Sequence, residues 1–296
     1  MHLSIIVPTL NERDAPRAIK ALRHRFKDAE ILVIDKSNDA YRRELIDTGV
    51  GVIAQWSKGY ESALMQGFSL AKGDIISTID PDGTYSVDDF ARVVGAVEAG
   101  EADFCIGNRF GHLHRGAMTK SIAFGNKALS LLFRLLYRKE LHDCLSGSFA
   151  MTREAFESIR DLDVFDAGTL FFEIELARRG YALEEIPISY RPRIGTKPKI
   201  NAKHIRGVTM AKHTIRFARD YDPLLIFGLL GLAMVAAGGI LGTSVLASYI
   251  HTGTLDQVGR ALISLMLIIL GVLAAVGGLI LDLLLQIEKA LIRRKS

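Results

Sequence analysis

Cysteine is scarce in this chain. Only Cys105 and Cys144 occur among 296 residues, and their spacing matches none of the paired patterns that bind zinc or iron–sulfur clusters. A framework of several disulfides and a cysteine-based metal centre are therefore excluded. No segment resembling a cleaved signal peptide precedes the apolar run at residues 4–8, so we expect a reducing, cytosolic setting for this part of the chain.

The glycine-rich phosphate cradles of two common nucleotide-binding classes are also missing. The sequence contains no G-x-x-x-x-G-K-[ST], and no G-x-G-x-x-G follows the first predicted strand. The chain therefore lacks the backbone amides that usually hold the phosphates in P-loop hydrolases and in dinucleotide-dependent oxidoreductases. If this chain binds a nucleotide diphosphate, a metal ion must carry much of the phosphate charge.

Charged residues are nearly absent from the last quarter of the chain until its final few residues. Residues 224–250 contain none, and residues 261–285 contain only Asp282. A helix of roughly 20 apolar residues spans a bilayer, so both segments are long enough to cross. Buried helices of a soluble domain are the alternative, but such helices usually keep a polar stripe. We predict two transmembrane helices at these two segments.

The basic residues around the predicted spans indicate their orientation. Residues 251–258, which connect the spans, contain no Lys or Arg, whereas Arg216 and Arg219 precede the first span and four basic residues lie between 289 and 295. Cytoplasmic flanks carry an excess of Lys and Arg. We therefore expect a multi-pass protein of the plasma membrane, with the N-terminal part and both termini in the cytoplasm.

The composition divides the chain into three parts. Residues 1–199 mix charged and apolar residues as globular domains do, residues 200–222 form a basic amphipathic segment expected at the membrane surface, and residues 223–296 form the membrane domain. Gly238 and Gly242 form a G-x-x-x-G pattern in the first span, which permits a homo-oligomer through the transmembrane helices.

Positive charge is concentrated locally, although the net charge is only +4. Lys and Arg gather in residues 109–139 and 191–219, which indicates phosphates or acidic lipid head groups as partners. We expect no nucleic-acid partner. Within the first stretch, residues 122–137 predict a helix with Leu129 and Phe133 on one stripe. Core packing and a position at the membrane interface both remain open for this helix.

Strand-length and helix-length segments alternate in the first third of the chain. Apolar, β-branched runs at residues 4–8, 31–35 and 74–80 predict strands, and residues 15–26 and 59–71 predict helices. This alternation is typical of a mostly parallel, doubly wound α/β sheet. Ligands of such sheets bind beyond the carboxyl ends of the strands.

Polar residues follow three of these strands, at the ends that should meet in one crevice. They are Thr9, Asn11 and Glu12 after the first strand, Asp35 after the second, and Asp80 and Asp82 after the third. Two carboxylates one residue apart can bind the same Mg²⁺ or Mn²⁺ ion, which then takes its other ligands from water and phosphates. An ordinary turn is the alternative, because Asp-Pro-Asp-Gly is rich in turn formers.

An ordered set of short motifs carries a family resemblance over nearly the whole chain. In order, the motifs are Ile6 to Glu12, Val33-Ile34-Asp35, Lys58-Gly59-Tyr60, Asp80-Pro81-Asp82, Gly107-Asn108-Arg109, Asp143 with Ser146-Gly147, Phe172-Glu173, Glu185 to Ile188, and Arg193 with Gly195 and Lys199. The set resembles the family 2 glycosyltransferases and, within them, the polyprenyl-phosphate (dolichyl-phosphate) hexose synthases.

This resemblance implies a GT-A fold, with a Rossmann-like, mostly parallel sheet, and inverting transfer of a hexose to polyprenyl (dolichyl) phosphate with Mg²⁺ or Mn²⁺. It assigns Asp80 and Asp82 to the metal, and catalytic roles to Asp82, Arg109 and Asp143. The acceptor phosphate would meet Arg109, Lys120 and Ser121. The nucleotide diphosphate sugar would meet Pro8, Thr9, Asn11, Glu12, Ile34, Asp35, Lys58, Asp80, Pro81, Asp82, Arg193 and Lys199.

Two positions depart from the family pattern. The family often has a second acidic residue after the one at Asp35, and this chain has Lys36. Dolichyl-phosphate mannose synthases tend to have glutamine two residues past the aspartate pair, where this chain has Thr84. The donor therefore stays open between GDP-mannose and UDP-glucose or UDP-N-acetylglucosamine.

The acceptor decides which side chains the chemistry needs. A phosphate monoester is ionised near neutral pH and can attack unaided, so the site must mainly align two anions and screen their repulsion. If the acceptor is a hydroxyl of a lipid-linked sugar or glycolipid, Asp143 is the candidate base. A non-catalytic membrane protein that binds nucleotide sugars is a further alternative. A processive polysaccharide synthase is excluded, because its Gln-x-x-Arg-Trp pattern is missing and the only tryptophan is Trp56.

Overall fold

A computed structural model defines the fold and describes residues 1–162, 169–193, 223–254 and 258–293. The chain divides into two compact units, Met1–Thr214 and Ile215–Ser296, and each is described by itself. The predicted boundaries at residues 199 and 222 stay predictions, because the basic segment 200–222 lies outside the described residues.

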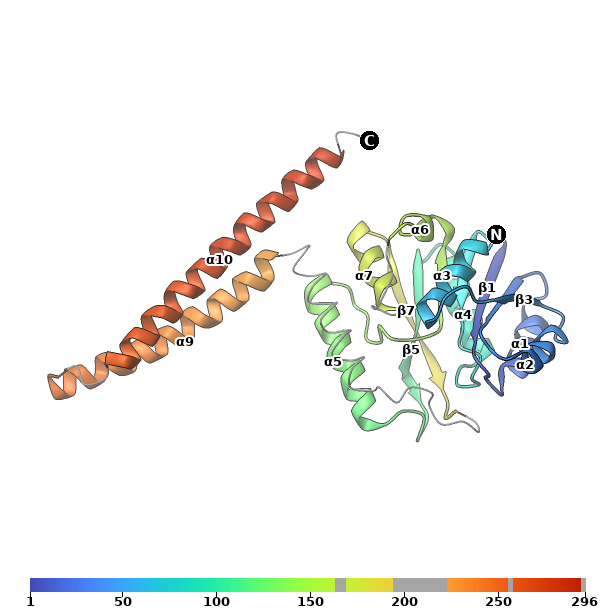
Figure 1. Ribbon diagram of the computed structural model, residues 1–296, viewed down its shortest axis with the longest axis horizontal. Coiled ribbons are helices and arrows are strands. Elements are labelled where there is room, and N and C mark those ends of the chain that lie inside the picture. Colours follow the sequence, from blue (N-terminus) through green and yellow to red (C-terminus); the bar gives the residue numbers. More distant parts are fainter. Residues whose placement is uncertain (163–168, 194–222, 255–257, 294–296) are drawn as a thin grey trace. The chain divides into compact units, whose positions relative to one another are not determined.

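Seven strands in the described part of the first unit form one mixed sheet (Figure 1). The order is β3-β2-β1-β4-β6-β5-β7, and β6 runs antiparallel to both of its neighbours while the other neighbouring strands are parallel. The strands are β1 (Leu3–Thr9), β2 (Glu30–Asp35), β3 (Gly51–Ala54), β4 (Ile75–Thr78), β5 (Phe104–Leu113), β6 (Phe149–Thr152) and β7 (Leu183–Tyr190).

Helices cover both faces of the sheet. On one face, α1 (Ala15–Arg25), α2 (Asp39–Ile46) and α4 (Val87–Glu98) bury apolar side chains against alternate residues of β1, such as Ile5 and Val7. Successive residues of a strand point to opposite faces. The intervening residues of β1 and β2 therefore face the second layer of helices.

That second layer contains α3 (Tyr60–Leu70), α6 (Arg153–Glu157) and α7 (Leu170–Arg179). Its centre is an aromatic cluster in which the ring of Phe68 makes edge contacts with Phe149, Phe156 and Phe172. α3 lies very close to the sheet, because a Cβ at Gly67 would come 2.5 Å from Cγ2 of Ile6. Helices on both faces and a mostly parallel sheet confirm the predicted fold class.

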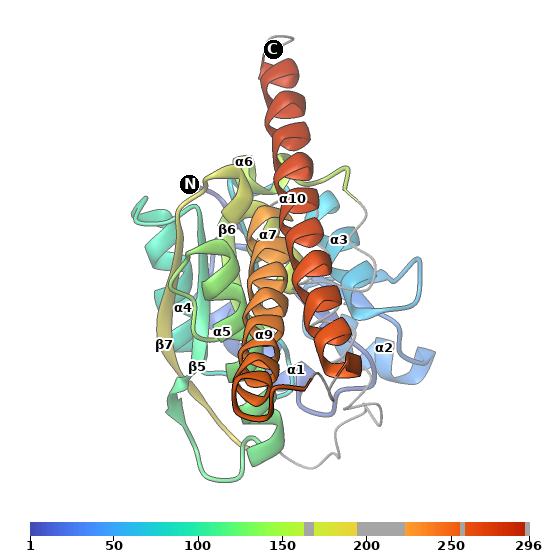
Figure 2. The same ribbon diagram turned by 90° about the vertical axis from the view of Figure 1, so that its left-hand side faces the viewer.

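The second unit consists, in its described part, of α9 (Pro223–Thr252) and α10 (Val258–Arg293), which lie side by side (Figure 2). Both contain a stretch long and apolar enough to cross a membrane, at Ile226–Thr252 and Val258–Leu284. Only 17% of the most apolar window of each stretch is buried within the structure, as expected for lipid-facing helices.

Small residues bring the two long helices together. A Cβ at Gly238 would come 2.8 Å from the backbone oxygen of Ser264, and one at Gly242 would come 2.8 Å from its Oγ. The Ser264 hydroxyl donates a hydrogen bond of 2.7 Å to the carbonyl of Gly238. The G-x-x-x-G pattern therefore faces α10 of the same chain, and a homo-oligomer stays a prediction.

Neighbouring glycines of α9 offer a matched test of this packing. Gly238→Leu is expected to lower the melting temperature of the detergent-solubilised protein, because the new side chain must enter a filled contact, which costs about 1–3 kcal/mol. Gly239→Leu adds the same side chain where nothing lies within 4 Å, and should leave the melting temperature nearly unchanged. Equal effects of the two substitutions would contradict this packing.

Candidate active site

Two acidic residues of the turn after β4 lie at the centre of the site. Asp80 accepts a hydrogen bond of 2.8 Å from the hydroxyl of Tyr60 through Oδ1. The Oδ1 atom of Asp82 accepts hydrogen bonds from the backbone amide of Thr84 at 3.1 Å and from its hydroxyl at 2.6 Å. Thr84, at one of the positions that depart from the family pattern, thus orients Asp82.

The environment of this pair suits a divalent cation. Burial, and then the nearby Asp82 carboxylate, raise the pKa of Asp80 to about 7. Two carboxylates this close repel one another, and a cation that binds both would relieve that repulsion. No group of three or more acidic, His or Cys side chains suited to a metal occurs among the described residues. A cation here would therefore share its coordination with water and substrate phosphates.

An arginine after β7 contacts the same acids. Nε and Nη2 of Arg193 donate to Oδ2 of Asp82 at 3.0 and 2.7 Å. Nη2 also lies 3.5 Å from Oε1 of Glu12, which follows β1. The two acidic residues and the arginine therefore join the ends of three different elements, as the sequence predicted for Glu12 and Asp82.

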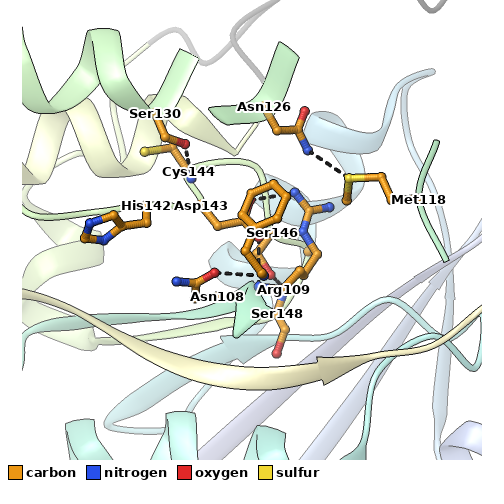
Figure 3. Close-up of polar contacts among 12 residues, drawn as sticks. Asn108, Arg109, Met118, Asn126, Ser130, His142, Asp143, Cys144, Ser146 and Ser148 are labelled. Carbon is orange, nitrogen blue, oxygen red and sulfur yellow. Dashed lines mark hydrogen bonds and ion pairs between the residues drawn. The ribbon is translucent and has the colours of Figure 1, made fainter. Parts of the chain in front are cut away.

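A second arginine, Arg109 on β5, forms a buried ion pair with Asp143 (Figure 3). Its Nε donates to Oδ2 of Asp143 and its Nη2 to Oδ1, both at 2.7 Å, and its backbone amide donates to Oδ2 at 2.9 Å. The guanidinium also lies over the ring of Tyr190, 5.4 Å from its centre. This two-point geometry fixes the plane of the guanidinium.

The loop that carries Asp143 is held at both of its ends. The backbone amide and Nδ1 of His142 contact the carboxylate of Glu185 on β7, which also accepts a hydrogen bond of 2.9 Å from Asn108. At the other end, the amide of Gly147 donates to the hydroxyl of Tyr85 at 2.9 Å. A Cβ at Gly147 would come 2.1 Å from Oδ2 of Asp80, so only glycine lets this loop lie against the acid.

The predicted donor side is a separate polar network at the ends of β1 and β2. Asp35 is fully buried, and its Oδ1 accepts from the hydroxyl of Thr9 at 2.9 Å and from the amide of Ser37 at 3.1 Å. Arg42 of α2 donates to Oδ2 at 3.0 Å. The Ser37 hydroxyl in turn accepts a hydrogen bond from the amide of Asn11, so these contacts join the segments that follow β1 and β2.

Most residues proposed from the family resemblance lie at this edge of the sheet. β1 and β2 bring Pro8 beside Ile34 and Thr9 beside Asp35. Lys58, Lys120 and Ser121 are exposed, and no contact joins them to the acidic pair or to Arg109 in the described part of the chain. Lys199 lies outside the described residues. Sequence reasoning missed the roles of Tyr60, Tyr85, Tyr190 and Arg42, and only Tyr60 belonged to a recognised motif.

A buried acid behind the site, Glu173 on α7, has no hydrogen-bond partner for either side-chain oxygen among the described residues. Burial raises its pKa well above the ordinary value of 4.5. The folded protein therefore keeps this carboxyl protonated at pH values where the unfolded chain releases the proton. The stability that Glu173 contributes is accordingly lost as pH rises above about 4.5.

We expect Glu173→Gln to raise the melting temperature at pH 8 and to reduce its decline between pH 5 and pH 8, since the amide has no proton to lose. The slope removed is at most about 1.4 kcal/mol per pH unit. Glu175 on the same helix is a matched control, because it is buried but paired with Arg178 and Arg179. Glu175→Gln should lower the melting temperature, and thermal melts followed by circular dichroism compare the two.

Comparison with known proteins defines the class of this fold and site. Residues 4–160 match the model of glycosyl transferase family 2, which covers more than half of the chain. The protein belongs to this family and is a glycosyltransferase.

Among relatives, it is 29% identical to glycosyltransferase AglJ of Haloferax volcanii over 98% of this chain and 96% of that one. It is 27% identical to a polyprenol monophosphomannose synthase of Mycolicibacterium smegmatis, over 68% of this chain and 82% of the other. The fold resembles glucosyl-3-phosphoglycerate synthase of Mycobacterium tuberculosis, solved with Mn²⁺ and UDP-glucose, with a TM-score of 0.59 and 19% identity over 73% of this chain and 79% of that one. Sugar transferases that act on polyprenyl or dolichyl phosphate are thus among its homologues.

Proposed function

We propose that this protein transfers a hexose from a nucleotide diphosphate sugar to polyprenyl (dolichyl) phosphate, with inversion at the anomeric carbon, at the cytoplasmic face of the plasma membrane. The observation that carries the proposal is the pattern of charged side chains after β4 and on β5. Two adjacent acids, Asp80 and Asp82, lie beside a buried arginine, Arg109, whose plane Asp143 fixes. Acids suit a metal-bound donor, and a fixed guanidinium suits a phosphate acceptor.

The proposed reaction is a displacement. An oxygen of the acceptor phosphate attacks the anomeric carbon of the sugar, the bond to the nucleoside diphosphate breaks, and the nucleoside diphosphate leaves. Arg109 would hold the attacking phosphate in line with the sugar and offset the repulsion between the two anions. Tyr190 packs against the guanidinium and Asp143 binds it, so both restrict its motion.

Asp80 and Asp82 would hold Mg²⁺ or Mn²⁺, which supplies positive charge to the departing diphosphate when bound. Tyr60 and Thr84 orient the two carboxylates. Burial, and then the Asp80 carboxylate, raise the pKa of Tyr60 well above its usual value, so its hydroxyl keeps the proton that it donates. The donor nucleotide would lie along the edge formed by Thr9 and Asp35.

The contacts of Asp143 favour a phosphate acceptor over a hydroxyl. Both of its oxygens accept hydrogen bonds from Arg109, and the side chain is fully buried. A carboxylate committed to an arginine in this way is poorly placed to take a proton from a hydroxyl. A phosphate acceptor needs no such base, and Asp143 then acts through Arg109 as a positioning residue.

Helix α5 (Lys120–Tyr137) has an apolar face that could contact the lipid. Leu129 and Phe133 are buried, which supports core packing of that side. The opposite side carries Phe124, Leu131 and Leu135, which are 76%, 48% and 63% exposed and lie at helical spacing. We propose that this second apolar face contacts the membrane that the two long helices cross.

Substitutions on the exposed face of α5 test this contact. Phe124→Glu and Leu135→Glu are expected to raise KM for a long polyprenyl phosphate in vesicles by about tenfold each, because each removes roughly 1–2 kcal/mol of apolar burial. KM for a short, water-soluble prenyl phosphate should not change. Ile46→Glu, at a residue of α2 that is 55% exposed, is the matched control and should affect neither substrate. Equal losses with both acceptors would contradict membrane contact by α5.

A donor panel tests the proposed reaction itself. The purified full chain, with Mn²⁺ and polyprenyl phosphate in detergent, should form a lipid-linked sugar from one of GDP-mannose, UDP-glucose and UDP-N-acetylglucosamine. Polyprenol, which lacks the phosphate, should not be glycosylated. Transfer to a lipid-linked sugar or a glycolipid, but not to the lipid phosphate, would overturn the proposal.

A further inference from the structure

Arg193 binds a carboxylate oxygen that a metal ion at Asp80 and Asp82 would also need. Its Nε and Nη2 both donate to one oxygen of Asp82, Oδ2, at 3.0 and 2.7 Å. The other oxygen of Asp82 accepts two hydrogen bonds from Thr84. Both oxygens of the more buried member of the acidic pair therefore already have partners.

A divalent cation on this pair would compete with the guanidinium. A cation that binds Asp80 and Asp82 needs an oxygen of Asp82, and Arg193 covers the one that Thr84 does not hold. Two positive groups on one carboxylate oxygen repel each other strongly when they are partly buried. Cation binding should therefore displace Arg193 from Asp82, leaving it beside Glu12 at 3.5 Å or longer.

A displaced Arg193 would have a new anion to bind close to Asp82. A guanidinium binds phosphate oxygens through two parallel hydrogen bonds, as it binds a carboxylate. The diphosphate of a sugar nucleotide bound to a cation at Asp80 and Asp82 would lie next to the cation. The arginine can thus exchange a carboxylate for a phosphate without leaving the site.

We propose that Arg193 is the counter-cation of Asp82 in the metal-free enzyme and that metal binding transfers it to the donor diphosphate. This inference rests on the proposed function and adds to it a coupling between two ligands. Metal binding breaks the ion pair between Arg193 and Asp82, which lowers the affinity for metal. The diphosphate of the nucleotide then offers Arg193 a new anionic partner. Each ligand therefore strengthens the binding of the other, by the same factor in both directions.

Direct metal binding tests the coupling without an activity assay. Isothermal titration of Mn²⁺ into the full chain in detergent, alone and with saturating GDP or UDP, gives the ratio of the two Kd values. In the unsubstituted protein we expect nucleotide to tighten Mn²⁺ binding roughly fivefold or more. In Arg193→Gln, Mn²⁺ alone should bind roughly fivefold tighter than in the unsubstituted protein. Nucleotide should then tighten Mn²⁺ binding by a smaller factor than in the unsubstituted protein, because only the direct contact between the cation and the phosphates remains.

Two variants separate charge from other effects. Arg193→Lys keeps a positive group beside Asp82, so its affinity for Mn²⁺ alone should stay close to that of the unsubstituted protein. Arg191→Gln removes the same charge from an exposed position two residues away, and should preserve both the affinity and the coupling. Thermal melts of each variant show that it is folded.

Three results would overturn the inference, and they can be told apart. If Arg193→Gln binds Mn²⁺ no more tightly than the unsubstituted protein, Arg193 does not compete with the metal, whereas the proposed function stands. If Mn²⁺ and nucleotide bind to the unsubstituted protein independently of each other, the proposal that Arg193 moves to the diphosphate is wrong. This result needs no variant, so it holds whether or not Arg193→Gln folds. If Mn²⁺ fails to bind with either nucleotide present, the metal-dependent function fails as well.

Discussion

Asp80→Asn is expected to lower kcat/KM for hexose transfer by roughly a thousandfold, because a metal ion supplies several kcal/mol of charge stabilisation and its binding needs both carboxylates. The same substitution should raise the melting temperature of the metal-free protein at pH 8 by a few degrees. Burial, and then Asp82, raise the pKa of Asp80 to about 7, so the folded protein disfavours the charged form that the neutral amide replaces.

Asp74→Asn is the matched control for this prediction. Asp74 precedes β4, at the end opposite Asp80, and its side chain accepts a hydrogen bond of 2.8 Å from the amide of His2. Activity of this variant should be unchanged. Mn²⁺ with nucleotide should raise the melting temperature of the unsubstituted protein and of Asp74→Asn, but not that of Asp80→Asn. Normal turnover by Asp80→Asn would rule out a metal site at this turn.

A double-mutant cycle on Arg109 and Asp143 is expected to be strongly non-additive. Arg109→Lys and Asp143→Asn should each lower kcat/KM for polyprenyl phosphate by roughly a hundredfold to a thousandfold. Lysine cannot make the two-point contact with Asp143, and asparagine removes the charge that fixes the guanidinium, so in each variant the positive group that meets the phosphate is no longer held in place. The double variant should lose no more than the worse single variant, because Asp143 acts only through the guanidinium that it binds.

The single substitution Asp143→Asn does not distinguish a phosphate acceptor from a hydroxyl acceptor. From the sequence, loss of activity in Asp143→Asn would have indicated a general base and a hydroxyl acceptor. Because Asp143 and Arg109 form a buried pair, the single substitution should now be harmful with either acceptor. A base with an independent role would make the two losses multiply. Melting temperatures of all three variants distinguish loss of chemistry from loss of the fold, because breaking a buried ion pair costs about 3–5 kcal/mol.

Local sequence patterns predicted the parts of the site that follow strands directly. Thr9, Asp35 and Asp80 come at or just after the ends of β-branched runs, and parallel pairing places such ends at one edge of a sheet. The two C-terminal helices were equally predictable, since an apolar stretch of more than 20 residues without charge usually forms a membrane-spanning helix. In both cases the signal lies within about 30 consecutive residues, as helix length and strand length require.

Contacts between distant residues were not predictable in this way. Arg193 and Asp82 are 111 residues apart, and they meet where the segment after β4 pairs with the end of β7, through a bridge between Tyr85 and Tyr190. The antiparallel β6 is only Phe149–Thr152, too short to show an alternating pattern. For α5 the sequence left core packing and a membrane-interface position open, and its one recognised stripe, with Leu129 and Phe133, proved to be the buried one.

The position of β6 has a consequence for how the enzyme is made. In the sheet that the described residues form, this strand lies between β4 and β5 and so links the parallel strands β1 to β4 to the pair β5 and β7. A nascent chain that ends before Phe149 exposes the edge of β4 and has no template for the arginine-bearing strand β5. The acidic turn and Arg109 should therefore come together late, in one cooperative step dominated by contacts between residues far apart in the chain, which predicts slow folding.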